Sequence, residues 1–294
     1  SFLRIAGLPR SLIVVGGEGN PDANWYLGTS HPVTTFHLVP YTDNQRSMDA
    51  PGYFWTPPDH ITSDTATLIG LEAKHAILVC RLRKGEMLTV TDGQGNAFDC
   101  EIIRASAKEV EGRIIRAHRR IGEPMALVTL AVGVGRPQVY DWIIEKSVEL
   151  GVTRIIPLRC HESPSGIGGD QAGERRVERW RRLALGAMKQ SLRSILPNID
   201  PITTPEAAAA LIEDHHRTWI ADSLGKSISD TPSEPPRTMK TLLIVGPEGG
   251  LTSAERDLFI SRGAIPISLG KRRLRAETAA IAALTLVMNH LGEL

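Results

Sequence analysis

The chain has 294 residues, of which 41% are hydrophobic, and its formal net charge is +1. This length is enough for two domains with buried cores, whereas a nearly neutral chain does not coat nucleic acid through overall charge alone. No apolar run reaches the roughly eighteen residues of a membrane helix and no secretory signal pattern stands near the start, so we expect a cytoplasmic protein with no membrane partner.

The cysteines give no sign of a metal centre. Cys80, Cys100 and Cys160 are widely separated, and no Cys or His spacing typical of metal ligands appears. We therefore expect three reduced, structural thiols and no bound metal.

Residues 1–51 do not form a recognisable element. They contain many turn-forming residues and no sustained hydrophobic period. We interpret this segment as an extension, with disorder as one reading of its composition.

Residues 52–121 predict a small β-rich domain. A short helix is expected within residues 72–86, closed by Gly85, and turn signals such as "DGQGN" separate the strands. Short strands with close turns are typical of a small barrel or sandwich, and the surface of such a barrel is a common place to hold nucleic acid. The expected strands are 65–70, 86–93, 96–105 and 109–117.

Residues 122–294 predict a second domain of a different kind, because apolar strands now alternate with helices. This alternation is typical of a parallel α/β sheet covered on both faces. Segments 163–174 and 222–240 are expected to be loops. The expected strands are 126–132, 153–158, 218–221, 241–245 and 266–269, and the expected helices are 137–150, 175–194, 205–214, 252–261 and 277–291.

Basic residues gather in three clusters, at residues 113–120, 175–182 and 271–275. Any one cluster is explained by a solvated face, but three on a neutral chain suggest a local basic surface for an acidic partner. Lys146 is a separate case, because it shares the apolar face of its predicted helix with Val139. It either snorkels to solvent or reaches into a site.

The stretch "GPEGGLT", residues 246–252, follows the apolar strand 241–245 and leads into a helix. Thr252 and Glu255 fit a capping box, and the glycines let the backbone bend or approach a ligand closely. Ligands of open α/β sheets bind outside the carboxyl ends of strands, although an ordinary strand-to-helix turn also fits. A phosphate-binding loop is poorly supported, because Gly-Lys-Ser/Thr is missing and "VGVGRP", residues 132–137, offers only two glycines of a dinucleotide fingerprint.

A second stretch, "SLGKRRLRAETAA", leaves a strand at Leu269 and Gly270 and also enters a helix. Arg275 and Glu277 flank the start of that helix. One cation and one anion beside a glycine loop indicate a small-molecule site, whereas the alternative is a helix cap with a surface ion pair.

The segments "GPEGGLTSAE" and "LGKRRLRAETAA" resemble the paired signature of the RsmE-type family, SPOUT-superfamily methyltransferases that act on N3 of a uridine in small-subunit (16S) ribosomal RNA. Further likeness comes from "DWIIEKSVELGVTRIIPL" and "ERWRRLALGAMKQSLR", and the resemblance extends over about residues 52–292. Two positions depart from the family pattern. Leu251 replaces an aromatic residue, and Glu162 stands where the family tends to place Arg.

The resemblance implies a fold and a cofactor. The fold is a SPOUT-type α/β parallel sheet with a C-terminal trefoil knot, preceded by a PUA-like β-barrel that binds RNA, and the assembly is a homodimer. The cofactor is S-adenosylmethionine (SAM), held by three loops at strand ends. The implied cofactor-binding residues are Ala221, Gly246, Pro247, Glu248, Gly249, Gly250, Leu269, Gly270, Leu274, Thr278 and Ala279.

We predict that Arg275 stabilises negative charge on the uracil ring and that Glu277 either orients Arg275 or accepts the N3 proton. The resemblance implies that the substrate is small-subunit ribosomal RNA or the 30S particle. The expected RNA contacts are Arg81, Lys146, Arg193 and Arg272. Two other functions stay open, namely a ribosome-assembly factor without catalysis and an α/β enzyme that uses a nucleotide phosphate.

Overall fold

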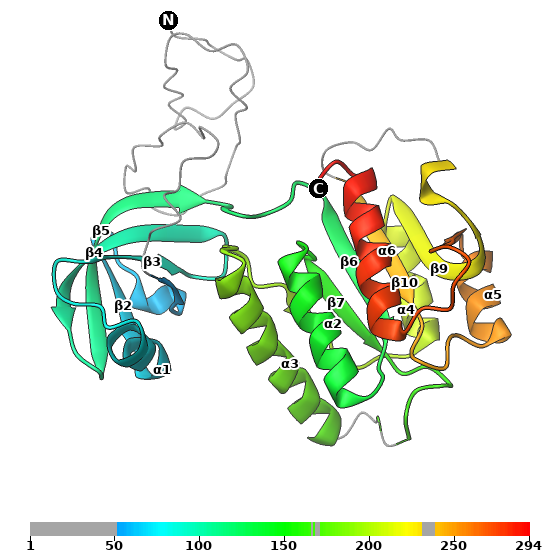
Figure 1. Cartoon of the computed structure of the whole chain (residues 1–294), viewed down its shortest axis with the longest axis horizontal. Coiled ribbons are helices and arrows are strands. Elements are labelled where there is room, and N and C mark those ends of the chain that lie inside the picture. The colour runs from blue at the N-terminus through cyan, green and yellow to red at the C-terminus, as the bar shows by residue number, and fades with distance from the viewer. Residues whose placement is uncertain (1–51, 166, 168–170, 231–238) are drawn as a thin grey trace, which may run out of the picture. The chain divides into compact units, whose positions relative to one another are not determined.

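The computed structural model describes residues 52–165, 167, 171–230 and 239–294. The predicted extension, residues 1–51, lies outside this part of the chain, as do pieces of the two predicted loops. The described residues form a five-stranded sheet followed by a six-stranded sheet (Figure 1). The boundary predicted between residues 121 and 122 falls between the last strand of the first sheet and the first strand of the second, and as a domain boundary it stays a prediction.

The first sheet is mixed and has the order β1-β3-β4-β5-β2. The predicted turn "DGQGN" joins β3 to β4, which pair antiparallel, and β1 adds parallel to β3. Alternate residues of these strands point into a core that includes Phe54, Leu88 and Ile102. The strands are β1 (Tyr53–Trp55), β2 (Thr65–Ile69), β3 (Met87–Thr91), β4 (Asn96–Ala105) and β5 (Glu109–Arg119), with a 3-10 turn η1 (Pro58–His60) after β1.

The helix of this domain is shorter than its predicted range. It comprises α1 (Gly70–Lys74) and one π-helical turn, η2 (His75–Val79). The helix stops there because Arg81 adopts the left-handed conformation, with a φ of 58°, which reverses the chain. Gly85, with a φ of 89°, then turns the chain into β3.

The second sheet has the order β11-β9-β10-β6-β7-β8, and every pairing in it is parallel. This arrangement confirms the predicted α/β fold class. The carboxyl ends of its strands therefore meet at one edge of the sheet, the carboxyl edge. The strands are β6 (Leu127–Gly133), β7 (Arg154–Leu158), β8 (Asn198–Ile199), β9 (Arg217–Lys226), β10 (Lys240–Val245) and β11 (Ile265–Ile267).

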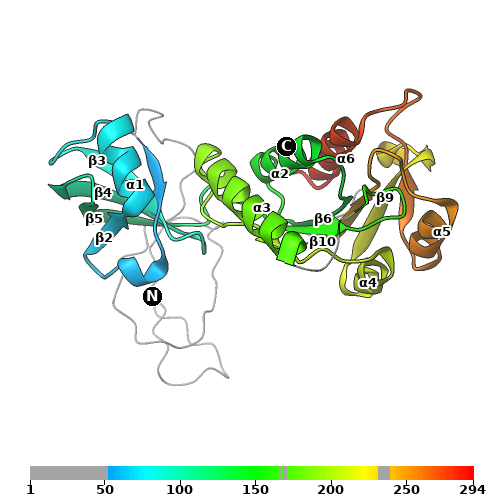
Figure 2. The same cartoon turned by 90° about the horizontal axis from the view of Figure 1, so that it is seen from below.

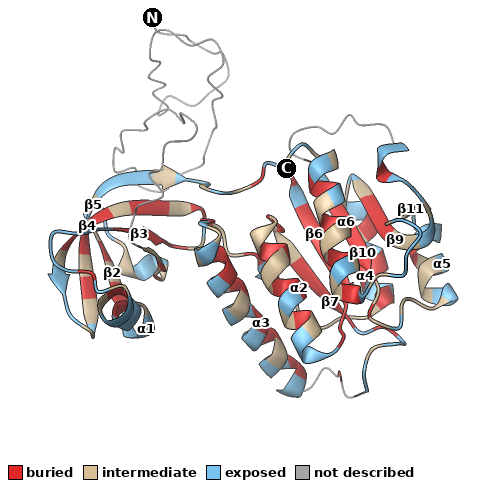
Figure 3. Ribbon diagram, viewed as in Figure 1, coloured by how far each residue is buried: buried red, intermediate tan, exposed pale blue. Residues whose placement is uncertain are grey.

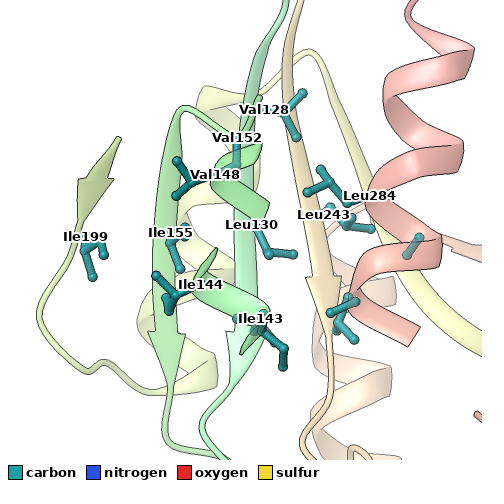
Figure 4. Close-up of a cluster of buried hydrophobic side chains, with 14 of the residues drawn as sticks. Val128, Leu130, Ile143, Ile144, Val148, Val152, Ile155, Ile199, Leu243 and Leu284 are labelled. Carbon is teal, nitrogen blue, oxygen red and sulfur yellow. The ribbon is translucent and has the colours of Figure 1, made fainter. Parts of the chain in front are cut away.

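Helices cover both faces of this sheet (Figures 1 and 2). On one face lie α2 (Pro137–Glu149), α3 (Gln171–Gln190) and α6 (Ala276–His290), and on the other lie α4 (Pro205–Ala210) and α5 (Ser253–Ser261). Neighbouring strand residues serve opposite faces, as the pleat requires, so Leu243 packs under α6 (Figure 4) whereas Ile244 packs with the α4 and α5 side. The strands are accordingly buried along most of their length (Figure 3).

Several predicted bounds are corrected by the structure. The helix expected at 175–194 begins at Gln171 and ends at Gln190, because Leu192 turns left-handed with a φ of 59°. The helix expected at 205–214 is α4 followed by a 3-10 turn, η3 (Leu211–Asp214), and the strand expected at 218–221 continues to Lys226 as β9. A further turn, η4 (Ile228–Asp230), precedes residues 231–238, which lie outside the described part; the trefoil knot stays a prediction.

Two buried thiols lie in or beside the two sheets. Cys100 lies on β4 and Cys160 follows β7, and both are free. Burial raises the pKa of each thiol to about 12.

Candidate functional site at the carboxyl edge

The loop that leaves β10 forms a tight turn before α5. The Gly250 N–H donates to the Pro247 carbonyl at 2.9 Å, and Gly250 has a φ of 85° that an L side chain rarely adopts. The predicted capping box is present, because Thr252 Oγ1 accepts from the Glu255 N–H while the Glu255 carboxylate accepts from the Thr252 N–H. The loop 246–250 is thus held at both ends.

The end of β6 approaches this loop closely. A Cβ atom at Gly133 would lie 2.3 Å from the Pro247 nitrogen, so a side chain there would collide with backbone, and one at Gly135 would lie 2.0 Å from Oε2 of the Glu248 side chain. We did not assign these glycines from the sequence, although the pair in "VGVGRP" was the available signal. Gly133 allows close contact with the backbone of the loop 246–250, and Gly135 leaves room for the Glu248 side chain.

Hydrogen bonds of the Glu248 side chain also join the loop 246–250 to the residues that follow β6. Its Oε1 accepts from the Arg136 N–H at 3.0 Å and from Arg136 Nε at 3.3 Å. Partial burial raises the pKa of Glu248, but the hydrogen bonds from Arg136 outweigh this effect, so the pKa lies below its ordinary value. The predicted cofactor residue Glu248 therefore contributes its backbone to the loop, while its carboxylate is engaged at the start of α2.

The loop that follows β7 joins the arrangement from the other side. The His161 N–H donates to Glu255 Oε1 at 2.8 Å. A Cβ atom at Gly249 would lie 2.6 Å from the Cβ of Glu162, the residue that departs from the family pattern. These contacts therefore hold together three connections at the carboxyl edge, namely residues 133–136, 159–163 and 246–252.

The neighbouring strands β9 and β11 end in an irregular pairing. Pro266 pairs with Ile220, but Ile267 pairs with Lys226, so residues 221–225 make an excursion that begins at the predicted site residue Ala221. Gly225 returns the chain so closely that its Cβ would lie 2.5 Å from the carbonyl carbon of Ile267. This excursion lies at the carboxyl edge, next to the strand that carries the loop 246–250.

The connection from β11 to α6 carries the remaining predicted cofactor residues. Gly270 has a φ of 101°, and its N–H donates to Ser268 Oγ at 3.2 Å. Leu269 is half-buried against the core, whereas Gly270 is exposed. Leu274, Thr278 and Ala279 lie at the end of this connection and in the first turn of α6.

The two predicted catalytic residues lie together at the start of α6. Arg275 is its N-cap residue, and the Arg275 side chain is 86% exposed. Its Nη1 lies 4.0 Å from Glu277 Oε1, and the Glu277 side chain is 20% exposed. An exposed guanidinium beside a shielded carboxylate is compatible with the roles that we predict for them, and those roles stay predictions.

The prediction that Arg193 contacts RNA is corrected by its burial. Arg193 is 1% exposed, and its Nη1 donates to the carbonyls of Val148 and Val152 at 2.8 and 2.9 Å. Its Nη2 donates to Glu123 Oε2 at 2.7 Å, and Glu123 Oε1 accepts from the Ser194 N–H. Arg193 is a structural residue, because its guanidinium is enclosed by protein.

The other predicted RNA contacts lie at the surface. Lys146 donates to Glu149 at 2.7 Å and to Glu145 at 3.1 Å. These hydrogen bonds, first that of Glu149, raise the pKa of Lys146, and the two carboxylates offset its charge. Arg81 and Arg272 are exposed, and neither forms an ion pair within the described residues.

The described residues contain neither a candidate metal site nor a membrane-spanning helix. No group of three or more His, Cys, Asp or Glu side chains is placed to hold a metal ion. No helix in the described ranges combines the length and the apolar character needed to cross a membrane.

Comparison with known proteins gives two family matches. Residues 123–288 match the model described as RNA methyltransferase domain, and residues 69–115 match the RNA methyltransferase PUA domain. The ribosomal RNA small subunit methyltransferase E of Bacillus subtilis is 28% identical over 229 residues, which cover 76% of this chain and 89% of the relative. The protein of the same name from Synechocystis is 29% identical over 243 residues, covering 78% and 75%.

Solved structures give the same result. The ribosomal RNA small subunit methyltransferase E of Neisseria gonorrhoeae, bound to S-adenosyl methionine, matches with a TM-score of 0.73 and 26% identity, covering 81% of this chain and 97% of that one. A protein of Legionella pneumophila in complex with SAM matches with a TM-score of 0.72 and 28% identity, covering 81% and 96%.

Proposed function

This chain belongs to the RNA methyltransferase family, and on that premise we propose that it methylates N3 of a uridine in small-subunit (16S) ribosomal RNA, with SAM as the methyl donor. The observation that carries this proposal is the assembly of three glycine-containing strand exits at one edge of the sheet. Relatives of this chain carry the name ribosomal RNA small subunit methyltransferase E, and two similar solved structures hold SAM.

The residues at the carboxyl edge fit SAM in shape and polarity. A Cβ atom at Gly250 or Gly270 would meet nothing within 4 Å, so open space borders both backbones. Ala221, Leu269 and Ala279 are half-buried and pack against the same core, so they would give the adenine an apolar floor. Backbone groups of the loops would then bind the polar parts of the ligand.

The chemistry depends on residues of this chain at the start of α6. When bound, SAM supplies a methyl group on a positively charged sulfur. Arg275 would hold the uracil and offset the negative charge that its ring oxygens gain when the N3 proton leaves. Glu277, 4.0 Å from Arg275, would either orient the guanidinium or accept that proton. Holding both reactants in line supplies a large part of the rate.

The substrate side of the proposal rests on the basic surface. Arg81 and Arg272 are exposed cations, which we assign to RNA phosphates, and Lys146 stays a candidate despite its two carboxylate partners. The 30S particle or its RNA is the proposed partner, and the reaction is assigned to the cytoplasm, where that RNA is found.

We also propose that the active unit is a homodimer with a knotted C-terminal segment. The support for a dimer is apolar surface on adjacent helices, because Trp142 of α2 is 46% exposed and Leu286 of α6 is 37% exposed. Two-fold pairs are the commonest oligomers. Sedimentation of the purified protein tests the assembly, and a monomeric mass at working concentration would reject it.

The decisive experiment maps methylated uridines in 16S RNA by mass spectrometry, with and without this protein. We expect one N3-methyluridine that depends on the wild-type protein and is lost with Arg275→Ala. Absence of that nucleotide would favour an assembly factor without catalysis. Stabilisation against heat by ATP or NAD, and not by SAM, would instead favour a nucleotide-using enzyme.

A further inference from the structure

The helical segment of the five-stranded domain, α1 and η2, buries small side chains and exposes large apolar ones. It buries the small residues Ala73 and Ala76, which are 0% exposed. It exposes large apolar ones, since Leu71 is 82%, Leu78 63% and Val79 68% exposed. A surface helix normally does the opposite, and several large apolar side chains exposed within one short segment point to an interaction site.

Four exposed apolar residues lie close together in the chain, within residues 69–79. Leu71 lies on α1, and Leu78 lies on the π-helical turn η2 that follows it. Val79 adjoins Leu78, and Ile69, 47% exposed, comes directly before the helix. We call Ile69, Leu71, Leu78 and Val79 the apolar face.

Four cations without acidic partners lie within this segment or just after it in the sequence. Lys74, Arg81, Arg83 and Lys84 are all exposed, and none forms an ion pair within the described residues. The two nearest acids in the chain are already engaged. Glu72 accepts from Lys189 Nζ at 2.5 Å, and the Glu86 carboxylate accepts from the Arg83 N–H at 2.8 Å.

The backbone holds these groups in a fixed arrangement. The segment contains a π-helical turn, a feature frequent at functional sites. After the left-handed turn at Arg81, the Leu82 side chain is 4% exposed and its N–H donates to the Ala76 carbonyl at 3.0 Å. The Gly85 N–H then donates to the Ile102 carbonyl of β4 at 2.8 Å. The apolar face is therefore anchored to the sheet rather than carried on a free loop.

We propose that the apolar face and its four cations dock unpaired nucleotides of the RNA substrate, outside the methyl-transfer site. Unstacked bases need apolar surface to pack against, and the phosphates that accompany them need cations. The combination of uncovered leucines with four unpaired cations fits such a segment better than it fits an uncharged partner. This inference rests on the proposed function, since it takes RNA as the substrate.

The test measures the affinity of the full chain for a small-subunit RNA fragment that carries the mapped uridine. The double variant Leu71→Ser with Leu78→Ser should raise the Kd for RNA about tenfold, with an unchanged salt dependence and an unchanged Kd for SAM. The matched control is Ile260→Ser, an exposed apolar residue of α5, which should leave the RNA Kd within about twofold.

A second variant separates charge from apolar contact. Lys74→Gln with Lys84→Gln should reduce the slope of log Kd against log salt by about one to two. Because these residues are exposed, this variant tests the proposal even if the leucine variant fails to fold.

Three outcomes would overturn the inference. They are an unchanged RNA Kd in the leucine variant, an unchanged salt slope in the lysine variant, and a change of oligomeric mass without a change of RNA affinity, which would assign the apolar face to a second copy of the chain. If the wild type itself methylated no RNA, the proposed function would fail. Normal methylation by the wild type together with unaltered RNA binding by both variants would reject the apolar face alone.

Discussion

Arg193 and Arg275 are both arginines that lie near a glutamate, and the structure gives them opposite surroundings. The Arg193 side chain is 2% exposed and its Nη2 lies 2.7 Å from Glu123, whereas the Arg275 side chain is 86% exposed and its Nη1 lies 4.0 Å from Glu277. Every direction around the first guanidinium is occupied by protein. The second guanidinium is largely exposed to solvent. Burial and satisfied hydrogen bonds, not residue type, therefore separate a structural arginine from a candidate catalytic one.

The largest effect should follow from breaking the buried pair. Arg193→Ala would leave the carboxylate of Glu123 buried without its cation, which costs about 3–5 kcal/mol of unfolding free energy. Urea denaturation followed by circular dichroism measures it. The double variant Arg193→Met with Glu123→Leu removes both charges and should recover most of the loss. A single variant that lost less than about 1 kcal/mol would place this pair in the same class as an exposed one.

Removing the exposed arginine should change the rate instead of the stability. We expect Arg275→Ala to lower kcat by about 10²–10³-fold, as loss of one preorganised charge-stabilising group does. Its unfolding free energy should stay within about 0.5 kcal/mol of the wild type. Methyl transfer from labelled SAM to RNA gives the rate, with Arg104→Ala, an exposed arginine of β4, as the control. Near-normal turnover with intact SAM binding would withdraw the assignment of Arg275.

Glycine substitutions test whether the loops of the carboxyl edge depend on close approach. Gly133→Ala would place a Cβ 2.3 Å from the backbone nitrogen of Pro247, so we expect a loss of about 1–3 kcal/mol and weaker binding of SAM. Gly186→Ala is the matched control, because its Cβ on α3 would meet nothing within 4 Å. That variant should gain up to about 1 kcal/mol of helix stability. Equal effects of the two substitutions would show that contact at Gly133 is unimportant.

The smallest change in stability should follow from removing the ion pair between Glu248 and Arg136. Glu248→Gln is expected to cost under about 1 kcal/mol at neutral pH, since the ion pair with Arg136 is partly exposed. The pKa of Glu248 is lowered in the folded chain, so its stabilising contribution is complete above the ordinary carboxyl pKa of about 4.3 and is lost as the pH falls through the lowered value. Unfolding curves of both proteins should therefore converge in acid. A stability difference that persisted unchanged at low pH would contradict this explanation.

The elements that could be predicted from the sequence were mostly long segments with a clear hydrophobic period. The alternation of apolar strands and amphipathic helices in residues 122–294 predicted a parallel sheet. The four residues from Thr252 to Glu255 were enough to predict the capping box. Strands β1 and β8 were missed, because three and two residues are too short to show a period. The site was harder to predict because its contacts join distant parts of the chain. The approach of Gly133 to Pro247 and the burial of Arg193 depend on how sheets and helices pack, which no local pattern contains.

The two buried, protonated cysteines, Cys100 on β4 and Cys160 just after β7, can report on local opening of the structure. Alkylating reagents attack thiolates, so Cys100 and Cys160 should stay unmodified until the strand beside them separates. The labelling rate of each sulfur, read by peptide mass, would then report how often its own sheet opens. One time course of labelling would therefore show which of the two sheets opens more often in the intact chain.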